Sequence, residues 1–109
     1  MKKTIFLSAI AMTLLACNPS NPLLDAPETP YGVPAFDQVK IEHYMPAFEA
    51  AIAEQKAEID AIVTNQAEPT FENTIVALDR TGMLLERVSG VFFNVLEADG
   101  NDEMNAIAE

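Results

Sequence analysis

Apolar residues recur at helical spacing in the first of two long stretches of this sequence. They lie among many alanines, which have a strong helix propensity, and Pro46 suits a first helical turn because its missing N–H has no partner there anyway. We therefore expect a helix over about 46–63. Its apolar stripe consists of Met45, Phe48, Ile52, Ile59 and Ile62, with Gln55 in the one polar slot. Its solvated face carries Glu49, Glu54, Lys56, Glu58 and Asp60.

The second stretch predicts a helix over about 71–97. Residues 64–69 form a polar connection of a length usual between antiparallel helices, and Thr70 is a suitable N-cap. Gly82 falls inside the stripe, where a glycine costs roughly 1 kcal/mol against alanine, and this suggests close approach of another helix. Gly90, next to Ser89, could instead allow a bend. The apolar stripe consists of Phe71, Ile75, Leu78, Leu85, Val88, Phe92 and Leu96.

A third helix is predicted over 102–109. Asp99 and Gly100 stop the preceding helix, and either Asn101 or Asp102 can cap the next one. No capping glycine or terminal basic residue closes this third helix, so we expect the sequence to be cut within it. The predicted fold class is all-α, an antiparallel helical hairpin followed by the start of a third helix over 41–109.

Residues 17–40 contain most of the prolines and are predicted to form an extended tether. Proline fixes φ and donates no backbone hydrogen bond, so this segment cannot be a helix or a central strand. It is nevertheless more apolar than a spacer requires, and we expect part of it to lie across a hydrophobic surface. The apolar residues concerned are Leu23, Leu24, Tyr31, Val33 and Phe36.

Residues 1–16 have the pattern of a secretory signal peptide. Lys2 and Lys3 precede an apolar stretch that is too short to span a bilayer, which needs ~20 residues. Residues 14–17, Leu-Leu-Ala-Cys, resemble the lipobox of bacterial lipoproteins, in which the cysteine becomes the lipidated first residue. We therefore predict export, lipidation of Cys17 and anchoring to a bacterial membrane in the cell envelope, on the periplasmic or surface side. An ordinary signal peptide with a cysteine at its boundary is the alternative.

Charge and composition restrict the remaining chemistry. The sequence has 17 acidic residues against six Lys and Arg, a net charge of −11, which becomes −13 once Lys2 and Lys3 are removed. Such acidity argues against nucleic acid as a partner. One Cys and one His cannot form a structural zinc site or an internal disulfide. His43 stands alone beside Glu42, which favours a capping or packing role, and no catalytic or metal-binding residue is predicted.

Several strings in a fixed order carry a resemblance to a known family. They are Pro30-Tyr-Gly-Val-Pro-Ala-Phe36, Ile41-Glu-His-Tyr-Met-Pro-Ala-Phe-Glu49, Pro69-Thr-Phe-Glu-Asn-Thr-Ile75, Val91-Phe-Phe-Asn94 and Asp99-Gly-Asn-Asp-Glu103. Together they resemble the N-terminal region of the peptidyl-dipeptidase Dcp family, zinc metallopeptidases related to oligopeptidase A and thimet oligopeptidase. The resemblance runs over about 21–109. It departs at Ala35 and Ile41, where family members often carry proline.

The resemblance implies a larger, mainly α-helical metallopeptidase of which this chain would be the N-terminal piece. The family binds zinc on a His-Glu-x-x-His helix with a further glutamate downstream, and His43 does not match that motif. No catalytic or metal-binding residue is therefore carried over, and zinc and an oligopeptide substrate are implied only for a full-length enzyme. For these helices the resemblance implies a place in the wall of a deep channel that admits short peptides.

Two hypotheses follow from the sequence. In the first, the chain is the N-terminal fragment of an exported zinc peptidyl-dipeptidase that releases dipeptides from the C-termini of oligopeptides, and it is inactive alone. In the second, it is a small acidic lipoprotein whose helical hairpin binds a protein partner. The apolar stripe of the second helix is compatible with both, because either the missing protein or a partner would cover it.

Overall fold

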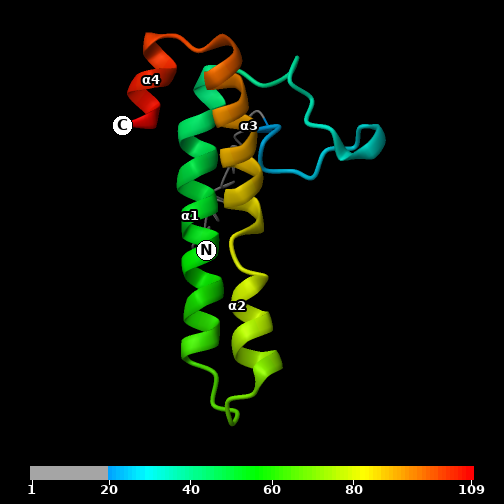
Figure 1. The fold of residues 1–109 in the computed structure, drawn as a ribbon, viewed down its shortest axis with the longest axis vertical. Coiled ribbons are helices and arrows are strands. Elements are labelled where there is room, and N and C mark those ends of the chain that lie inside the picture. The colour runs from blue at the N-terminus through cyan, green and yellow to red at the C-terminus, as the bar shows by residue number, and fades with distance from the viewer. Residues whose placement is uncertain (1–19) are drawn as a thin grey trace, which may run out of the picture.

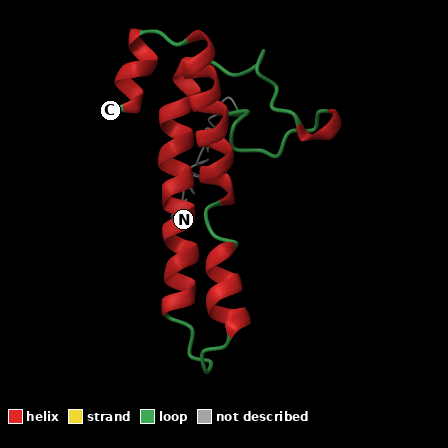
Figure 2. Ribbon diagram, in the orientation of Figure 1, coloured by secondary structure: helices red, strands yellow, loops and turns green. Residues whose placement is uncertain are grey.

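The computed structural model describes residues 20–109, and every regular element within that range is helical (Figure 1; Figure 2). The all-α prediction is confirmed for these residues. The predicted signal peptide and Cys17 lie outside the described residues. None of the described helices is long and apolar enough to cross a bilayer.

The elements are the 3₁₀ turns η1 (Pro30–Gly32) and η2 (Ile41–His43), α1 (Tyr44–Val63), the π-helical η3 (Phe71–Val76), α2 (Ala77–Asp79), α3 (Met83–Asp99) and α4 (Asp102–Ala108).

The hydrophobic core lies between α1 and α3, which run side by side (Figure 1). Phe92 of α3 is fully buried and meets two aromatic rings of α1 edge-on, with centroid distances of 4.9 Å to Tyr44 and 5.4 Å to Phe48. Such edge-to-face pairs contribute about 0.5–1.5 kcal/mol beyond their buried area. Met104 of α4 is also buried, so the last helix closes one end of this core.

The face of α1 that packs against α3 is not the predicted stripe of large apolar residues. Ala47 and Ala51 are completely buried, whereas Met45 and Ile52 are 48% and 42% exposed. The physical reason is close packing: a row of alanines lets the two helices approach, and the large side chains of α3 fill the space. The stripe on α1 was predicted at the correct spacing, but most of it does not face the core.

The predicted continuous helix over 71–97 is wrong, because the chain breaks between α2 and α3. Gly82 adopts a left-handed conformation, with φ of 75°, which a continuous right-handed helix does not contain. The turn before it is closed by the N–H of Arg80, which donates to the carbonyl of Val76, and by that of Thr81, which donates to Leu78.

Two side chains of α1 hold this break. The carboxylate of Glu58 accepts the N–H of Gly82 at 2.7 Å. The Nε2 of Gln55 lies only 2.5 Å from the position that a Cβ at residue 82 would occupy. The predicted close approach of another helix at Gly82 is therefore confirmed. Glu58 does not sit on a fully solvated face as predicted, because it is half-buried in this contact.

The break separates the predicted stripe of the second helix into two parts. In α3, Val88 and Phe92 are buried, whereas before the break Phe71 and Leu78 are 72% and 52% exposed. The helical register cannot be carried through a left-handed residue, so the two halves do not present one common face. Leu84 and Val91, which were not assigned to the stripe, are buried in the core.

The ends of the helices follow the predicted capping chemistry. Thr70 and Asn73 cap η3 reciprocally: the Thr70 side chain accepts the N–H of Asn73 at 3.1 Å, and the Asn73 side chain accepts the N–H of Thr70 at 2.7 Å. For α4, the cap is Asn101, whose side chain accepts the N–H of Met104. α3 continues through Ser89 and Gly90 as one helix.

Replacing Gly82 with alanine is expected to destabilise the hairpin. The left-handed conformation costs a non-glycine residue roughly 1–2 kcal/mol, and the new Cβ would displace the Gln55 side chain. The denaturation midpoint, followed by circular dichroism, should fall. Gly90→Ala is the control, because its Cβ meets nothing within 4 Å and alanine favours helix. Equal effects of the two substitutions would contradict this account of the break.

Burial raises the pKa of the Tyr44 phenol above its ordinary value of 10.0. Because the fold favours the neutral phenol, this contribution to stability is complete below pH 10.0 and is lost as the pH rises through the raised pKa. An ultraviolet absorbance titration of Tyr31→Phe, which leaves Tyr44 as the one tyrosine, should show ionisation displaced to high pH and accompanied by loss of helix. Ionisation near the ordinary value in a folded hairpin would contradict it.

Candidate functional site

The described residues preceding η2 are joined to the helices by a small set of polar contacts. We refer to residues 20–40 as the strap. Near its start, the side-chain amide of Asn21 donates to the carbonyl of His43 at 2.7 Å, and the side-chain oxygen of Asn21 accepts the N–H of Leu23 at 3.0 Å. The N–H of Leu24 also donates to the carbonyl of Asn21 at 3.0 Å. Asn21 therefore forms a tight turn and ties it to the start of α1.

This turn places Leu23 in the hydrophobic core, where it is 3% exposed. Full burial of a leucine side chain contributes roughly 1.5–3 kcal/mol, so the strap is held by packing as well as by hydrogen bonds. The prediction that part of the proline-rich segment lies across a hydrophobic surface is confirmed at Leu23 and at the partly buried Val39. The other apolar residues named in that prediction are exposed: Leu24, Tyr31, Val33 and Phe36.

Arg87 of α3 fastens the same turn from the other side. Its Nη2 donates to the carbonyl of Leu24 at 2.9 Å and, more weakly, to that of Leu23 at 3.4 Å. A hydrogen bond from a charged donor contributes about 1.5–3 kcal/mol, although the exposed part of this contact is screened by water. Within the described residues, the Nε of Arg87 is buried without a partner. The guanidinium thus holds the backbone of the strap through Nη2 alone.

A hollow of about 360 Å³ lies between the strap and α3. Leu23, Val39 and Val91 form apolar parts of its wall, and Arg87 is the cationic group that borders it. Asp25 and Glu28 of the strap also line it, so the charge of the guanidinium is opposed by two carboxylates. Among the described residues that line this hollow, none pairs a nucleophile with a base. Leu23, Val39 and Val91 pack there in or against the hydrophobic core.

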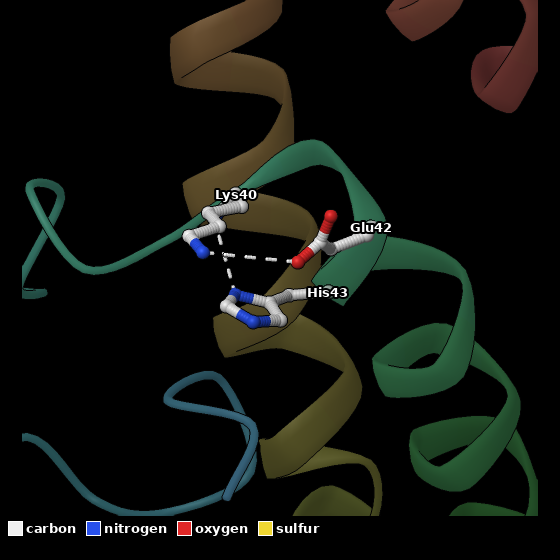
Figure 3. A network of polar contacts seen from close by, with 3 residues as sticks. All are labelled: Lys40, Glu42 and His43. Atoms are coloured by element: carbon white, nitrogen blue, oxygen red, sulfur yellow. Dashed lines mark hydrogen bonds and ion pairs between the residues drawn. The ribbon is translucent and has the colours of Figure 1, made fainter. Parts of the chain in front are cut away.

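His43 lies in a second polar cluster at the start of α1 (Figure 3). The backbone N–H of Lys40 donates to Nδ1 of His43 at 3.1 Å, and the N–H of His43 donates to the carbonyl of Lys40 at 3.0 Å. The Lys40 ammonium lies 3.9 Å from a carboxylate oxygen of Glu42, and both side chains are exposed, so this ion pair contributes little. The predicted capping role of His43 is confirmed.

The side chains of residues 20–109 do not fit a zinc ion. These residues contain no group of three or more His, Cys, Asp or Glu side chains placed to hold a metal. Asn101, which together with Asp99 and Glu103 superficially resembles part of a calcium loop, uses its side-chain oxygen to cap α4. Cys17, the predicted lipidation site, lies outside the described residues.

Sequence reasoning missed the three residues that organise this region. Glu58 was assigned to the solvated face, and Arg87 and Asn21 were given no role. Weak signals were present: Asn21 precedes a proline, which favours a turn, and Arg87 is a basic residue directly before Val88 of the predicted apolar stripe. The pairing of Arg87 with Leu23 and Leu24 could not be predicted, since it joins residues more than 60 positions apart.

Most of this chain is similar in sequence to a short part of two longer peptidases. It is 46% identical over 90 residues to a dipeptidyl carboxypeptidase of Salmonella typhimurium strain LT2, a match that covers 83% of this chain and 13% of the relative. It is 45% identical over 89 residues to a dipeptidyl carboxypeptidase of Escherichia coli strain K12, covering 82% of this chain and again 13% of the relative. No family model matches the chain.

The chain thus spans about an eighth of the length of these curated relatives. Identity at this level over some 90 residues implies a shared fold for the matched segment. The resemblance to the peptidyl-dipeptidase family is therefore confirmed for most of this chain, as a match to one segment of much longer dipeptidyl carboxypeptidases.

Proposed function

We propose that this chain is the N-terminal helical part of a longer zinc peptidyl-dipeptidase, exported and lipid-anchored through Cys17. The whole enzyme would release dipeptides from the C-termini of oligopeptides. The observation that carries this proposal is the identity of 45–46% to two dipeptidyl carboxypeptidases over more than four-fifths of the chain. The lipobox-like sequence ending at Cys17 supports the proposed export and anchoring.

In this proposal residues 20–109 have a structural role. The described side chains include no set that fits zinc, so the hydrolytic chemistry belongs to the rest of the enzyme. This part is a pair of packed helices. Apolar side chains are exposed on its distal half, the half that contains the connection between α1 and η3, among them Val63, Phe71 and Leu78. Exposed apolar residues of this kind are typical of a surface that packs on further protein, here the wall of the substrate channel.

The 109-residue chain alone is expected to hydrolyse no peptide, with or without added zinc. The reason is the absence of a metal-binding cluster from the described residues and of a His-Glu-x-x-His motif from the sequence. Chromatographic detection of dipeptides released from an oligopeptide is the measurement. Zinc-dependent release by the purified chain would overturn the assignment of catalysis to another part of the enzyme.

A chimera tests the proposal directly. In this chimera, the part of this chain that matches the Escherichia coli dipeptidyl carboxypeptidase replaces the corresponding segment of that enzyme. The chimera should still release dipeptides from oligopeptides. Ala51 and Ala53 provide a matched pair of controls, because the first is completely buried against α3 and the second is exposed on the same helix. In the chimera Ala51→Glu should abolish activity by placing a charge in the core, whereas Ala53→Glu should not. An inactive, folded chimera would contradict the proposed role.

The alternative function is a small acidic lipoprotein whose helical hairpin binds a protein partner. The exposed apolar residues of the distal half favour it, because a partner would cover them equally well. The DNA beyond codon 109 separates the two functions. A sequence encoding His-Glu-x-x-His, in frame or after a frameshift, supports the peptidase, and a stop codon without such a sequence nearby supports the small lipoprotein.

Lipid attachment is tested separately. Cys17→Ser should abolish incorporation of labelled fatty acid and leave the helix content of the chain unchanged, because Cys17 precedes the described fold. Mass spectrometry of the exported wild-type protein should find an acylated Cys17 as the first residue. An unmodified Cys17, or cleavage elsewhere, would return the sequence to an ordinary signal peptide.

A further inference from the structure

We propose that the strap fastens the helical body against the membrane surface and is not the free extended tether that its prolines predict. This inference rests on the lipid anchor at Cys17 that forms part of the proposed function. It concerns a separate matter, the interaction surface that the anchored molecule presents to the lipid. The partner is the headgroup layer of the bilayer that holds the anchor.

The first observation is where the strap is attached. Its firm contacts are at its beginning, between Asn21 and Leu24. Leu23 is buried in the core, the side-chain amide of Asn21 bonds to the carbonyl of His43, and Arg87 bonds to the carbonyls of Leu23 and Leu24. The chain is therefore fixed to both long helices within a few residues of the position of Cys17.

The second observation is the length of chain that remains free. Four Cα–Cα steps separate Cys17 from Asn21, so these two residues lie at most about 15 Å apart. A free extended tether over 17–40 would instead reach roughly 70 Å, because a proline-rich chain extends by about 3.1 Å per residue. A lipid on Cys17 consequently holds the body at contact distance from the headgroups, since the prolines downstream of Leu24 add nothing to its reach.

The third observation is that the short connection from Cys17 holds the surface at the start of α1 close to the lipid. Ser20 and Asn21 border a second hollow, at the start of α1, whose other wall includes Glu42, His43 and Pro46. The connection between α1 and η3 is at the other end of α1 (Figure 1), which spans 20 residues or about 30 Å. The start of α1 is therefore the end that meets the membrane.

The charge of this surface indicates the kind of headgroup that it fits. Asp25 and Glu42 are exposed beside the point of attachment, and the exposed Lys40 ammonium lies 3.9 Å from Glu42, so these three side chains carry a net charge of −1. Asp25 also lines the second hollow. Carboxylates held at contact distance are repelled by anionic lipid and not by a zwitterionic headgroup. The structure thus assigns to the start of α1 a surface suited to zwitterionic lipid.

Energy transfer tests the placement. A donor fluorophore is attached to the lipidated full chain at Glu42→Cys or, as the matched distal label, at Asn65→Cys, and the chain is bound to phosphatidylcholine vesicles with acceptor-labelled headgroups. Transfer should be stronger from position 42 than from position 65. In the double variant Asn21→Ala/Arg87→Ala this difference should be lost. Equal transfer from the two positions in the otherwise unaltered chain would overturn the placement.

Hydrogen exchange tests the strap without the lipid. In Cys17→Ser, the amides of Leu23 and Leu24 should be protected, and Asn21→Ala/Arg87→Ala should remove that protection, whereas Arg80→Ala, an exposed arginine, should not. Unprotected amides in the unaltered strap would overturn the inference. Absence of acyl chains from Cys17 by mass spectrometry would refute the anchor in the proposed function and, with it, the membrane surface, while the exchange result would still report on the strap.

Discussion

The packing of Phe92 against α1 is the interaction on which the rest of this structure depends. Its ring meets Tyr44 and Phe48 edge-on and lies in the same core as the completely buried alanines Ala47 and Ala51. Alanine on one helix and a large aromatic residue on the other allow a short distance between axes without a cavity. Leu23 of the strap and Met104 of α4 are buried in the same cluster, so both ends of the described chain are organised by it.

The sequence predicted the elements of this fold better than the faces they bury. Helical periodicity, the connection over 64–69 and the cap at Thr70 are local properties, and the structure agrees with them. The choice of face on α1 depends on what approaches it. Burial of large apolar residues ordinarily contributes more free energy than burial of alanines, so the sequence favours the stripe as the buried face of α1. The large side chains of α3 already fill the space between the helices, however, and only small side chains fit opposite them.

The candidate site shows the same limit more strongly. His43 could be assigned to a cap from its neighbours in sequence, and the structure places its Nδ1 on the backbone of Lys40. Glu58 and Arg87 could not be assigned, because their partners, Gly82 and the turn at Leu23–Leu24, lie 24 and more than 60 positions away. A prediction from amphipathic periodicity places every charged residue on the solvated face. It cannot identify a charged side chain that forms hydrogen bonds with the backbone of another element.

The contact between Arg87 and the strap has a consequence for the order of folding. It closes a loop of 64 residues, and the entropy of closing so long a loop is offset only once α3 offers its guanidinium and its apolar face together. α1 and α3, by contrast, meet through a much shorter connection. The hairpin is therefore expected to form first, and docking of Leu23 follows as a separate late step. During synthesis the strap, which precedes the helices in the sequence, is thus the last described segment to reach its native contacts.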